Sequence, residues 1–280
     1  MLKSFCAAAL SLSTLMLSIP GHAIVGGQKL EVLDGLREST VLLYIYSKDS
    51  NRICTGTLIA KDLVLTAGHC TADESLHEEI AVGFGVDSED AFTENGKIKT
   101  YGTVVRSAVV DEYDRNQSQG SHTVQYDLAI LQFKGSLPKE AKVRALPEAG
   151  YSIPEKSVLI LSGYGLNDEM HPDESALRAV GYSAGYLAEA VYDEAQKKAY
   201  QFPSAIIVEQ PHGGVCEGDS GGPLLVQDGD KLTMVGVASY ALNPNATVKD
   251  GSQRCRGSAA FVDVRKNLGW IQAAIAALKN

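Results

Sequence analysis

Short runs of apolar and β-branched residues recur along most of this chain, each bounded by turn-forming residues. Runs of about 4–8 such residues between turn signals are typical of β-strands. The pattern therefore predicts a mostly β protein. Its expected strands lie at 40–46, 56–59, 63–66, 127–133, 158–161, 205–208, 223–226 and 234–239.

Two segments have a helical pattern instead. Residues 187–200 are rich in Ala, Glu, Gln and Lys, which favour helices. In residues 268–279 the apolar side chains recur at helical spacing and would share one face. That face consists of Trp270, Ile271, Ala274, Ile275 and Leu278. We expect a helix in each segment, the second at the C-terminal end of the fold.

The first 23 residues are expected to lie outside the fold. Lys3 precedes an apolar run at 5–19, and Ala23 offers a small residue at a cleavage position. This is the pattern of a secretory signal peptide, and the run is shorter than the roughly 20 apolar residues of a membrane span. Residues 24–280 are enough for one large all-β domain or two fused small barrels.

Composition and charge narrow the function classes. The 280 residues are 45% hydrophobic and 21% charged, which is ordinary for a globular protein. The formal net charge of −9 argues against nucleic-acid binding. Beyond the N-terminal segment, no stretch is long and apolar enough to cross a bilayer. We expect no nucleic-acid partner, and no membrane association after signal removal.

Four cysteines remain beyond the signal segment. They are Cys54, Cys70, Cys216 and Cys255. In an exported protein four cysteines usually form two disulfides, and sequence alone permits three pairings. A metal site is the competing interpretation, but the spacings lack the close C-x-x-C pairs typical of zinc. Disulfides are therefore favoured.

Three short motifs stand far apart in the chain. They are Thr-Ala-Gly-His-Cys at 66–70, Tyr-Asp-Leu-Ala-Ile at 126–130 and Gly-Asp-Ser-Gly-Gly-Pro at 218–223. A serine hydroxyl is a weak nucleophile unless a base takes its proton and a third group orients that base. The motifs supply His, Asp and Ser in that order. Together with their flanking residues, they resemble those of the trypsin/chymotrypsin family of serine endopeptidases.

This resemblance implies an all-β fold. It consists of two antiparallel six-stranded β-barrels with the active site between them and a C-terminal helix against the first barrel. The protease domain would span 24–280, with the boundary between its halves at roughly 135–155. The resemblance also selects the disulfides Cys54–Cys70 and Cys216–Cys255.

The resemblance assigns a role to each catalytic residue. Ser220 would be the nucleophile, His69 the general base and then the general acid, and Asp127 the group that holds the imidazole tautomer. The backbone N–H groups of Gly218 and Ser220 would form the oxyanion hole. No cofactor and no metal are expected.

An activation device is implied as well. In relatives, a new N-terminus that begins Ile-Val-Gly-Gly inserts its amino group beside the aspartate preceding the nucleophile. Here Ile24 begins this sequence directly after Ala23, and the aspartate is Asp219. We hypothesise that signal removal itself creates the activating terminus.

The residues expected to form the specificity pocket are Gly214, Val215, Ser239, Tyr240, Ala241 and Ala259. The trypsin branch has an aspartate where this chain has Gly214, so a preference for Lys or Arg is not supported. Chymotrypsin-like pockets have glycines where Ala241 and Ala259 stand, and their methyl groups would narrow the slot. The expected preference is for small or medium apolar residues before the scissile bond.

One departure from the relatives concerns packing. Leu159 and Val226 stand where relatives carry a third disulfide. We predict that the two side chains touch, so that an apolar contact replaces a covalent one.

Two other functions remain open. One is a non-catalytic binding protein on the same scaffold, because fold does not fix function. The other is an esterase with the same machinery, although the extended segment 239–241 suits pairing with a peptide backbone. The leading interpretation is a secreted serine endopeptidase, extracellular or periplasmic. Its expected partners are peptide or protein substrates and protein inhibitors, and a monomer is expected.

Overall fold

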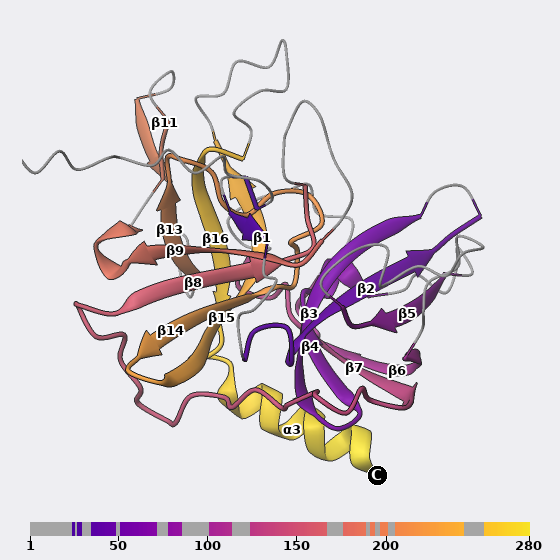
Figure 1. Ribbon diagram of the computed structural model, residues 1–280. Helices are drawn as coiled ribbons and strands as arrows, with labels where there is room; N and C mark the ends of the chain where they lie inside the picture. Colours follow the sequence, from indigo (N-terminus) through magenta and orange to yellow (C-terminus); the bar gives the residue numbers. More distant parts are fainter. Residues whose placement is uncertain are drawn as a thin grey trace, which may run out of the picture.

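The computed structural model places two β units side by side, with one helix below them (Figure 1). The expected all-β class is therefore confirmed. The predicted signal segment 1–23 lies outside the described residues. The structure describes residues 24–25, 27–29, 35–48, 51–71, 78–85, 101–113, 124–166, 176–188, 191–193, 197–200, 205–243 and 255–280.

The first unit is a closed six-stranded barrel in the order β2-β3-β4-β7-β6-β5. Its strands are β2 (Thr40–Tyr46), β3 (Arg52–Ala60), β4 (Leu63–Thr66), β5 (Glu79–Gly83), β6 (Gly102–Val109) and β7 (Ala129–Gly135). The sequence Leu-Val-Leu-Thr of β4 is buried at every position, because this strand pairs on both sides and faces the second unit. Continuous apolar runs of this kind are typical of strands buried on both faces.

The second unit is an eight-stranded sheet in the order β1-β9-β8-β14-β15-β16-β13-β10. Its strands are β1 (Gln28–Lys29), β8 (Val158–Gly163), β9 (Arg178–Ser183), β10 (Leu187–Ala188), β13 (Ala205–Gln210), β14 (Pro223–Asp228), β15 (Lys231–Leu242) and β16 (Gly257–Asp263). Although β1 precedes the strands of the first barrel in the sequence, it pairs with β9 of this unit.

The expectation of a second closed six-stranded barrel needs correction. In the described part of the chain, β9 and β13 do not pair, because other strands occupy their free edges. β1 pairs with β9, and β10 pairs with β13. A short 3₁₀ helix (Ala184–Tyr186) leads from β9 directly into β10. The chain connection therefore runs from β9, next to one edge of this sheet, to β10 at the other edge.

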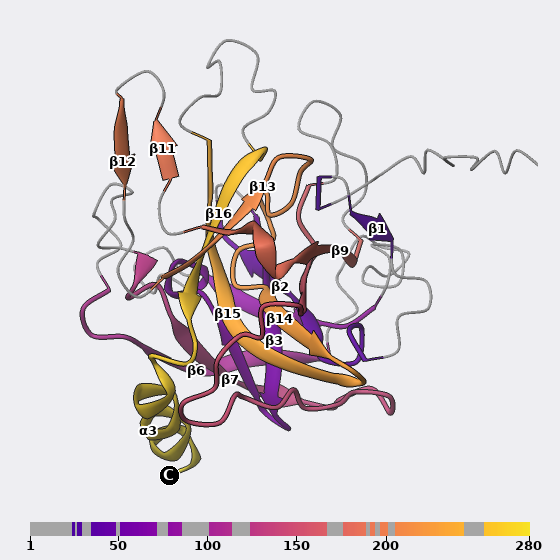
Figure 2. The same ribbon diagram turned by 90° about the vertical axis from the view of Figure 1, so that its left-hand side faces the viewer.

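The predicted helix at 187–200 is wrong. The described residues of this segment form β10 and a two-stranded ribbon of β11 (Val191–Asp193) and β12 (Lys198–Tyr200), whose strands lie side by side in Figure 2. In β10, Leu187 and Ala188 pair with Val208 and Ile207 of β13. Helix propensity is a weak preference, and cross-strand pairing overrides it here.

The predicted C-terminal helix is confirmed as α3 (Leu268–Lys279). It buries Ile271, Ala274 and Leu278 and contacts β6 and β7 of the first barrel, as expected. The guanidinium of Arg106 on β6 donates to the carbonyls of Leu278 and Ala277, at 3.1 and 3.3 Å. These contacts satisfy carbonyls that a helix C-terminus leaves without partners. No helix in the described part of the chain has the length and apolarity needed to cross a membrane.

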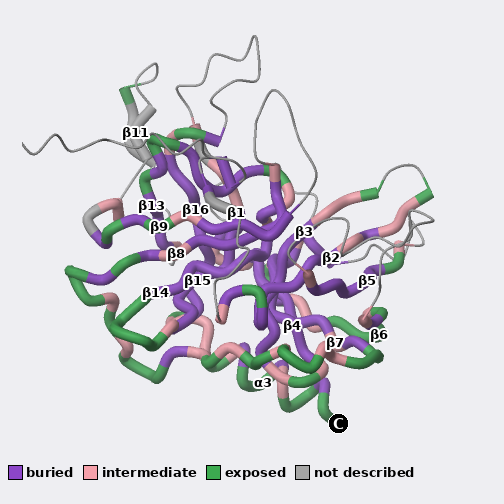
Figure 3. The backbone as a smooth tube through the Cα atoms, viewed as in Figure 1, coloured by how far each residue is buried: buried purple, intermediate pink, exposed green. Residues whose placement is uncertain are grey.

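The largest apolar core cluster spans both units. Leu65 and Ile130 of the first barrel share it with Leu225, Val237 and Val262 of the second sheet. In Figure 3 the buried residues run without interruption from one unit to the other, while exposed residues gather on the outer turns. The two units are therefore packed against each other through a shared, close-packed core, which fixes their relative position.

The predicted contact between Leu159 and Val226 is confirmed. The two residues are register partners in the β8–β14 pair and share one core cluster. Both are fully buried. Apolar packing thus occupies the place where relatives carry a disulfide.

Leu159→Ala is expected to lower the free energy of unfolding by about 2–4 kcal/mol, because it removes buried methyl groups and leaves a cavity. The control is Val158→Ala on the same strand, where the side chain is 41% exposed. It should change stability by less than about 0.5 kcal/mol. Equilibrium denaturant unfolding measures both variants. Equal effects of the two substitutions would contradict this description of the core.

Candidate active site

His69 and Asp127 come from the adjacent ends of two paired strands. In the antiparallel β4–β7 pair, Thr66 lies opposite Ala129. His69 follows β4 in a short 3₁₀ helix (Gly68–Cys70), and Asp127 lies two residues before the start of β7. The strand pairing thus brings together two residues that are 58 positions apart in the sequence.

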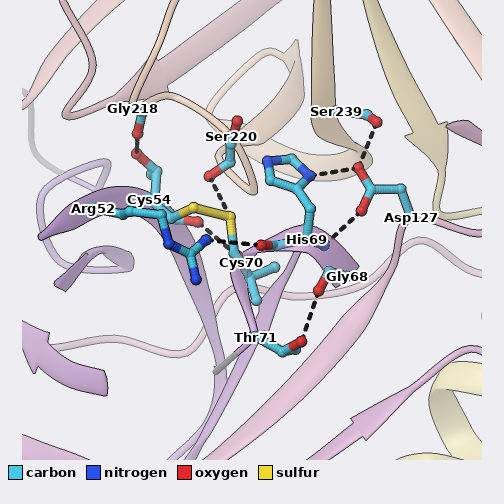
Figure 4. The surroundings of a disulfide bond; sticks show 12 residues. Arg52, Cys54, Gly68, His69, Cys70, Thr71, Asp127, Gly218, Ser220 and Ser239 are labelled. Atoms are coloured by element: carbon cyan, nitrogen blue, oxygen red, sulfur yellow. Dashed lines mark hydrogen bonds and ion pairs between the residues drawn. A yellow bond between two sulfur atoms is a disulfide. The ribbon is translucent and has the colours of Figure 1, made fainter. Parts of the chain in front are cut away.

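The buried carboxylate of Asp127 accepts three hydrogen bonds. One oxygen accepts from the backbone N–H of His69 at 2.8 Å. The other accepts from His69 Nδ1 at 2.8 Å and from the hydroxyl of Ser239 at 2.6 Å. Because a carboxylate can only accept, Nδ1 carries the proton, and Nε2 of the neutral ring is left as an acceptor. Figure 4 shows the ring between Asp127 and Ser220.

Ser239 reaches Asp127 because of a β-bulge. In the β15–β16 pair, Ala238 is opposite Phe261 and Tyr240 is opposite Ala260, so Ser239 is the additional residue. A bulge re-aims a side chain out of the regular alternation of a strand. The hydroxyl of a residue in the second unit is thereby directed at the carboxylate of the first.

Ser220 faces the same cleft as His69. The cleft is lined by Asn51, Arg52, Ile53, Cys54, His69, Tyr164, Gly165, Leu166, Glu217, Gly218 and Ser220. Within the described part of the chain, no hydrogen bond joins Ser220 Oγ to the imidazole. Contacts between nucleophile and base are often long in enzymes without substrate and shorten in the complex. The structure therefore places the imidazole of His69, which contacts Asp127, on the same cleft as Ser220.

The backbone N–H groups of Gly218 and Ser220 make no hydrogen bond within the described residues, although both residues line the cleft. Gly218 has a φ of +94°, a conformation that favours glycine, and a Cβ there would lie 2.8 Å from the Cα of Gly165. Oxyanion holes are built from backbone donors that are not engaged within the protein.

Asp219 points away from the cleft into the second unit. Its two carboxylate oxygens accept from the N–H groups of Gly165 and Cys216, at 2.8 and 2.9 Å. Burial raises the pKa of Asp219 to about 7, even though these two hydrogen bonds and the charge of Arg178 act in the opposite direction. Ile24 is fully buried nearby in the core of this unit, and no contact joins it to Asp219 within the described residues.

Both expected disulfides are present. Cys54–Cys70 ties β3 to the His69 segment, and Cys216–Cys255 ties the Ser220 segment to the start of β16. Among the described residues, the only group with the spacing of metal ligands is Cys54, His69 and Cys70. Its two sulfur atoms are bonded to each other, so the thiolates that a metal would need are not available.

The expected pocket residues lie on β15, on β16 and in the segment before Cys216 of the second unit. Ala241 and Ala259 are register partners on β15 and β16, so their methyl groups are adjacent. Gly214 and Val215 are buried in the segment before Cys216. Tyr240 stacks beside His69, with ring centroids 6.2 Å apart and planes 13° apart.

Gln210 belongs to this region and was not predicted from the sequence. Its fully buried side-chain amide donates to the carbonyls of Val215 and Cys255, at 3.0 and 2.7 Å. Its oxygen accepts from the N–H of Val215 at 2.9 Å. A Cβ on Gly214 would lie 2.3 Å from that oxygen, so glycine is required there. Gln210 therefore fixes the two backbone segments of the expected pocket relative to each other.

Comparison with known proteins places these features in a family. The model of the Trypsin family matches residues 24–261. Coagulation factor XII of Sus scrofa is 27% identical over 266 residues, covering 90% of this chain. The chain spans 39% of the length of that relative. A solved structure titled human heparin binding protein matches with a TM-score of 0.60 and 22% identity, covering 90% of this chain and 96% of that one.

The raised pKa of Asp219 predicts a specific pH dependence of stability. Because this carboxyl holds its proton up to about 7 in the folded chain, against 3.8 ordinarily, the free energy of unfolding should fall as pH rises between those values. Asp219→Asn should remove this part of the slope. Denaturant unfolding at pH 5 and pH 8 measures the change in the free energy of unfolding. The protein used is the full chain, in which Ile24 is still joined to residue 23. The same pH dependence of the free energy of unfolding in the wild type and in Asp219→Asn would contradict the prediction.

Proposed function

Because the chain belongs to the trypsin family, we propose that it is a secreted serine endopeptidase. Ser220 is the nucleophile, His69 the general base and then the general acid, and Asp127 the group that orients the imidazole. The observation that carries this proposal is the triple hydrogen bonding of Asp127, which leaves His69 Nε2 as an acceptor on the cleft that Ser220 lines.

The proposed reaction has two stages. His69 Nε2 takes the proton of Ser220 Oγ as that oxygen attacks the carbonyl carbon of the scissile peptide bond. The resulting oxyanion accepts from the N–H groups of Gly218 and Ser220. His69 then gives the proton to the leaving amine, which departs and leaves an acyl group on Ser220. Water attacks this ester as His69 takes its proton; His69 then returns that proton to Ser220 Oγ, and the acid product leaves.

We further propose a preference for small or medium apolar residues before the scissile bond. The adjacent methyl groups of Ala241 and Ala259 narrow the place where a side chain would enter. No acidic residue stands at Gly214 to attract Lys or Arg. Support also comes from Gln210, whose side-chain amide is held by the backbone of Val215 and Cys255 and carries no charge that would attract Lys or Arg.

The activating terminus is proposed to arise when residues 1–23 are removed on export. Ile24 and Val25 already lie against the segment before Ser220: a Cβ on Gly213 would be 1.8 Å from the carbonyl oxygen of Val25. Ile24 has a φ of +39°, which is strained for a β-branched residue. That torsion ceases to exist when the bond to residue 23 is cut, so cleavage relieves the strain and yields an ammonium group for Asp219.

A second candidate function is a non-catalytic binding protein on the same scaffold. The absence of a hydrogen bond between Ser220 Oγ and His69 favours it, and the solved neighbour is named for heparin binding. An esterase is a third candidate, because its chemistry would need the same residues. The presence of all three members of the proposed triad favours a hydrolase over the binding protein.

A fluorophosphonate probe is expected to label the exported chain once, at Ser220, and to abolish its cleavage of casein. Mass spectrometry locates the adduct. Ser220→Ala should remove both labelling and cleavage, while Ser136→Ala, outside the cleft, should change neither. Stable folded protein without labelling would support the binding protein. Labelling without casein cleavage, but with ester hydrolysis, would support the esterase.

A panel of chromogenic peptides that differ only in the residue before the scissile bond tests the preference. Ala, Val and Leu peptides should give higher kcat/KM values than Arg and Lys peptides, because the expected pocket is narrow and has no acidic floor. Arg as the best residue, with the apolar peptides silent, would overturn this part of the proposal.

Sequencing of the exported protein should begin at Ile24. Activity should then fall on the alkaline side, as the new α-amino group, with an ordinary pKa of about 7.7–8.0, loses its proton. A different first residue, together with the need for a separate activating protease, would end the hypothesis that signal removal activates the protein. A rate that stays level well above that pH would contradict the ion pair.

A further inference from the structure

Thr55 connects the first barrel to the loop that carries the proposed oxyanion donors. It is fully buried on β3, next to Cys54. Its hydroxyl donates to the carbonyl of Gly218 at 2.9 Å and accepts from the N–H of Tyr164 at 3.0 Å. Its own N–H donates to the carbonyl of Ser220 at 2.8 Å. One residue thus holds two carbonyls of the segment 218–222 around Ser220, which we call the catalytic loop.

The backbone of Thr55 is free for this role because of its place in the barrel. The β3–β4 pairing begins further along, with Thr57 opposite Leu65. At Thr55 the loop around Ser220 takes the position that a strand would otherwise occupy. The carbonyl of Thr55 is held as well, since it accepts from the hydroxyl of Thr66 at 2.8 Å. Each of its polar groups therefore has a partner, and the side chain is fixed in one orientation.

These contacts bear on the orientation of the oxyanion donors. The carbonyls of Gly218 and Ser220 belong to the peptide groups that follow each of these residues. Holding them restricts the peptide groups on either side of the peptide that joins Asp219 to Ser220, which carries the Ser220 N–H. Glycine rotates more freely than other residues, so the peptide after Gly218 gains most from such a restraint. With both carbonyls tied to Thr55, the N–H groups of Gly218 and Ser220 stay unengaged at the cleft.

We propose that Thr55 is a positioning residue for the oxyanion hole, acting through its hydroxyl on the Gly218 carbonyl. The catalytic consequence rests on the proposed function, whereas the restraint on the loop does not. Strand formation alone would be served equally well by valine, which is nearly isosteric and favours β-strands. The hydroxyl is therefore present for the loop and not for the barrel.

The same strand supplies a matched control. Thr57 lies two positions along β3, points to the same face and is equally buried. Its hydroxyl makes no hydrogen bond to any residue that the structure describes. Thr57→Val therefore makes the same chemical change as Thr55→Val, in the same strand, without removing a contact to the loop.

The test compares Thr55→Val, Thr55→Ser and Thr57→Val with the wild type, using a peptide substrate that the wild type cleaves. Thr55→Val should lower kcat roughly 10–100-fold, with KM within about 2-fold, because displaced donors weaken binding of the transition state more than of the substrate. Thr55→Ser keeps the hydroxyl and should stay within about 3-fold of the wild type in kcat. Thr57→Val should equal the wild type.

Amide hydrogen exchange tests the loop restraint without any assay of activity. The N–H groups of Asp219, Gly221 and Gly222 are hydrogen-bonded and should exchange slowly. Thr55→Val should accelerate their exchange by about 10-fold or more relative to Thr57→Val, with the strands of the barrel unchanged. If Thr55→Val does not fold, the comparison is made between Thr55→Ala and Thr55→Ser, because these two variants differ only in the presence of the hydroxyl.

The outcomes separate the two proposals. An inactive wild type would refute the proposed function, and the exchange data would still decide whether Thr55 holds the loop. An active wild type with equal kcat in Thr55→Val and Thr57→Val would overturn the positioning role. Equal exchange in these two variants would overturn the restraint itself.

Discussion

The hydrogen bonding of Asp127 is the constraint on which the rest of the site depends. A charge removed from water is costly unless its partners are in place, and this carboxylate is fully buried. Two of its donors belong to His69 in the first barrel, and the third is Ser239 in the second unit. A shift between the two units would remove a donor from a buried charge. The same group therefore fixes the imidazole and the alignment of the two halves.

The opposite side of the cleft is held by a different kind of contact. There Thr55 of the first barrel donates a neutral hydrogen bond to the catalytic loop. Within the second unit, the buried carboxyl of Asp219 in this loop accepts from the N–H groups of Gly165 and Cys216. The pKa of that carboxyl is raised to about 7 by burial. Asp219, which precedes Ser220 in the chain, therefore changes its charge near neutral pH. A shared apolar core behind both sides keeps the two units in register.

Sequence patterns predicted the features that depend on local chemistry. The runs at 63–66 and 223–226 are buried strands, and the apolar spacing in 268–279 gives a helix with the expected face. The cysteine pairing and the contact of Leu159 with Val226 followed from the family resemblance and are present in the structure. The residue types at 69, 127 and 220 were recognisable because catalysis by serine needs that combination.

Features that depend on long-range pairing were not predictable in this way. Helix propensity at 187–200 gave the wrong element, because pairing with β13 decides the structure there. The contact of Thr55 with Gly218 joins residues 163 positions apart, and nothing in a threonine on a strand marks it as a contact to another unit. Gln210 is similar, since a glutamine at a strand end is ordinarily solvent-exposed. Its role appears only when the backbone of Val215 and Cys255 surrounds it.

The most direct test of the central claim is the tautomer of His69. Nitrogen NMR of protein labelled with ¹⁵N in its 6 histidines, compared with Asp127→Asn, identifies the imidazole that contacts the carboxylate. The account predicts that the neutral ring of His69 carries its proton on Nδ1 and leaves Nε2 bare, and that Asp127→Asn changes this signal. A wild-type His69 with its proton on Nε2, or a spectrum that Asp127→Asn does not change, would contradict it.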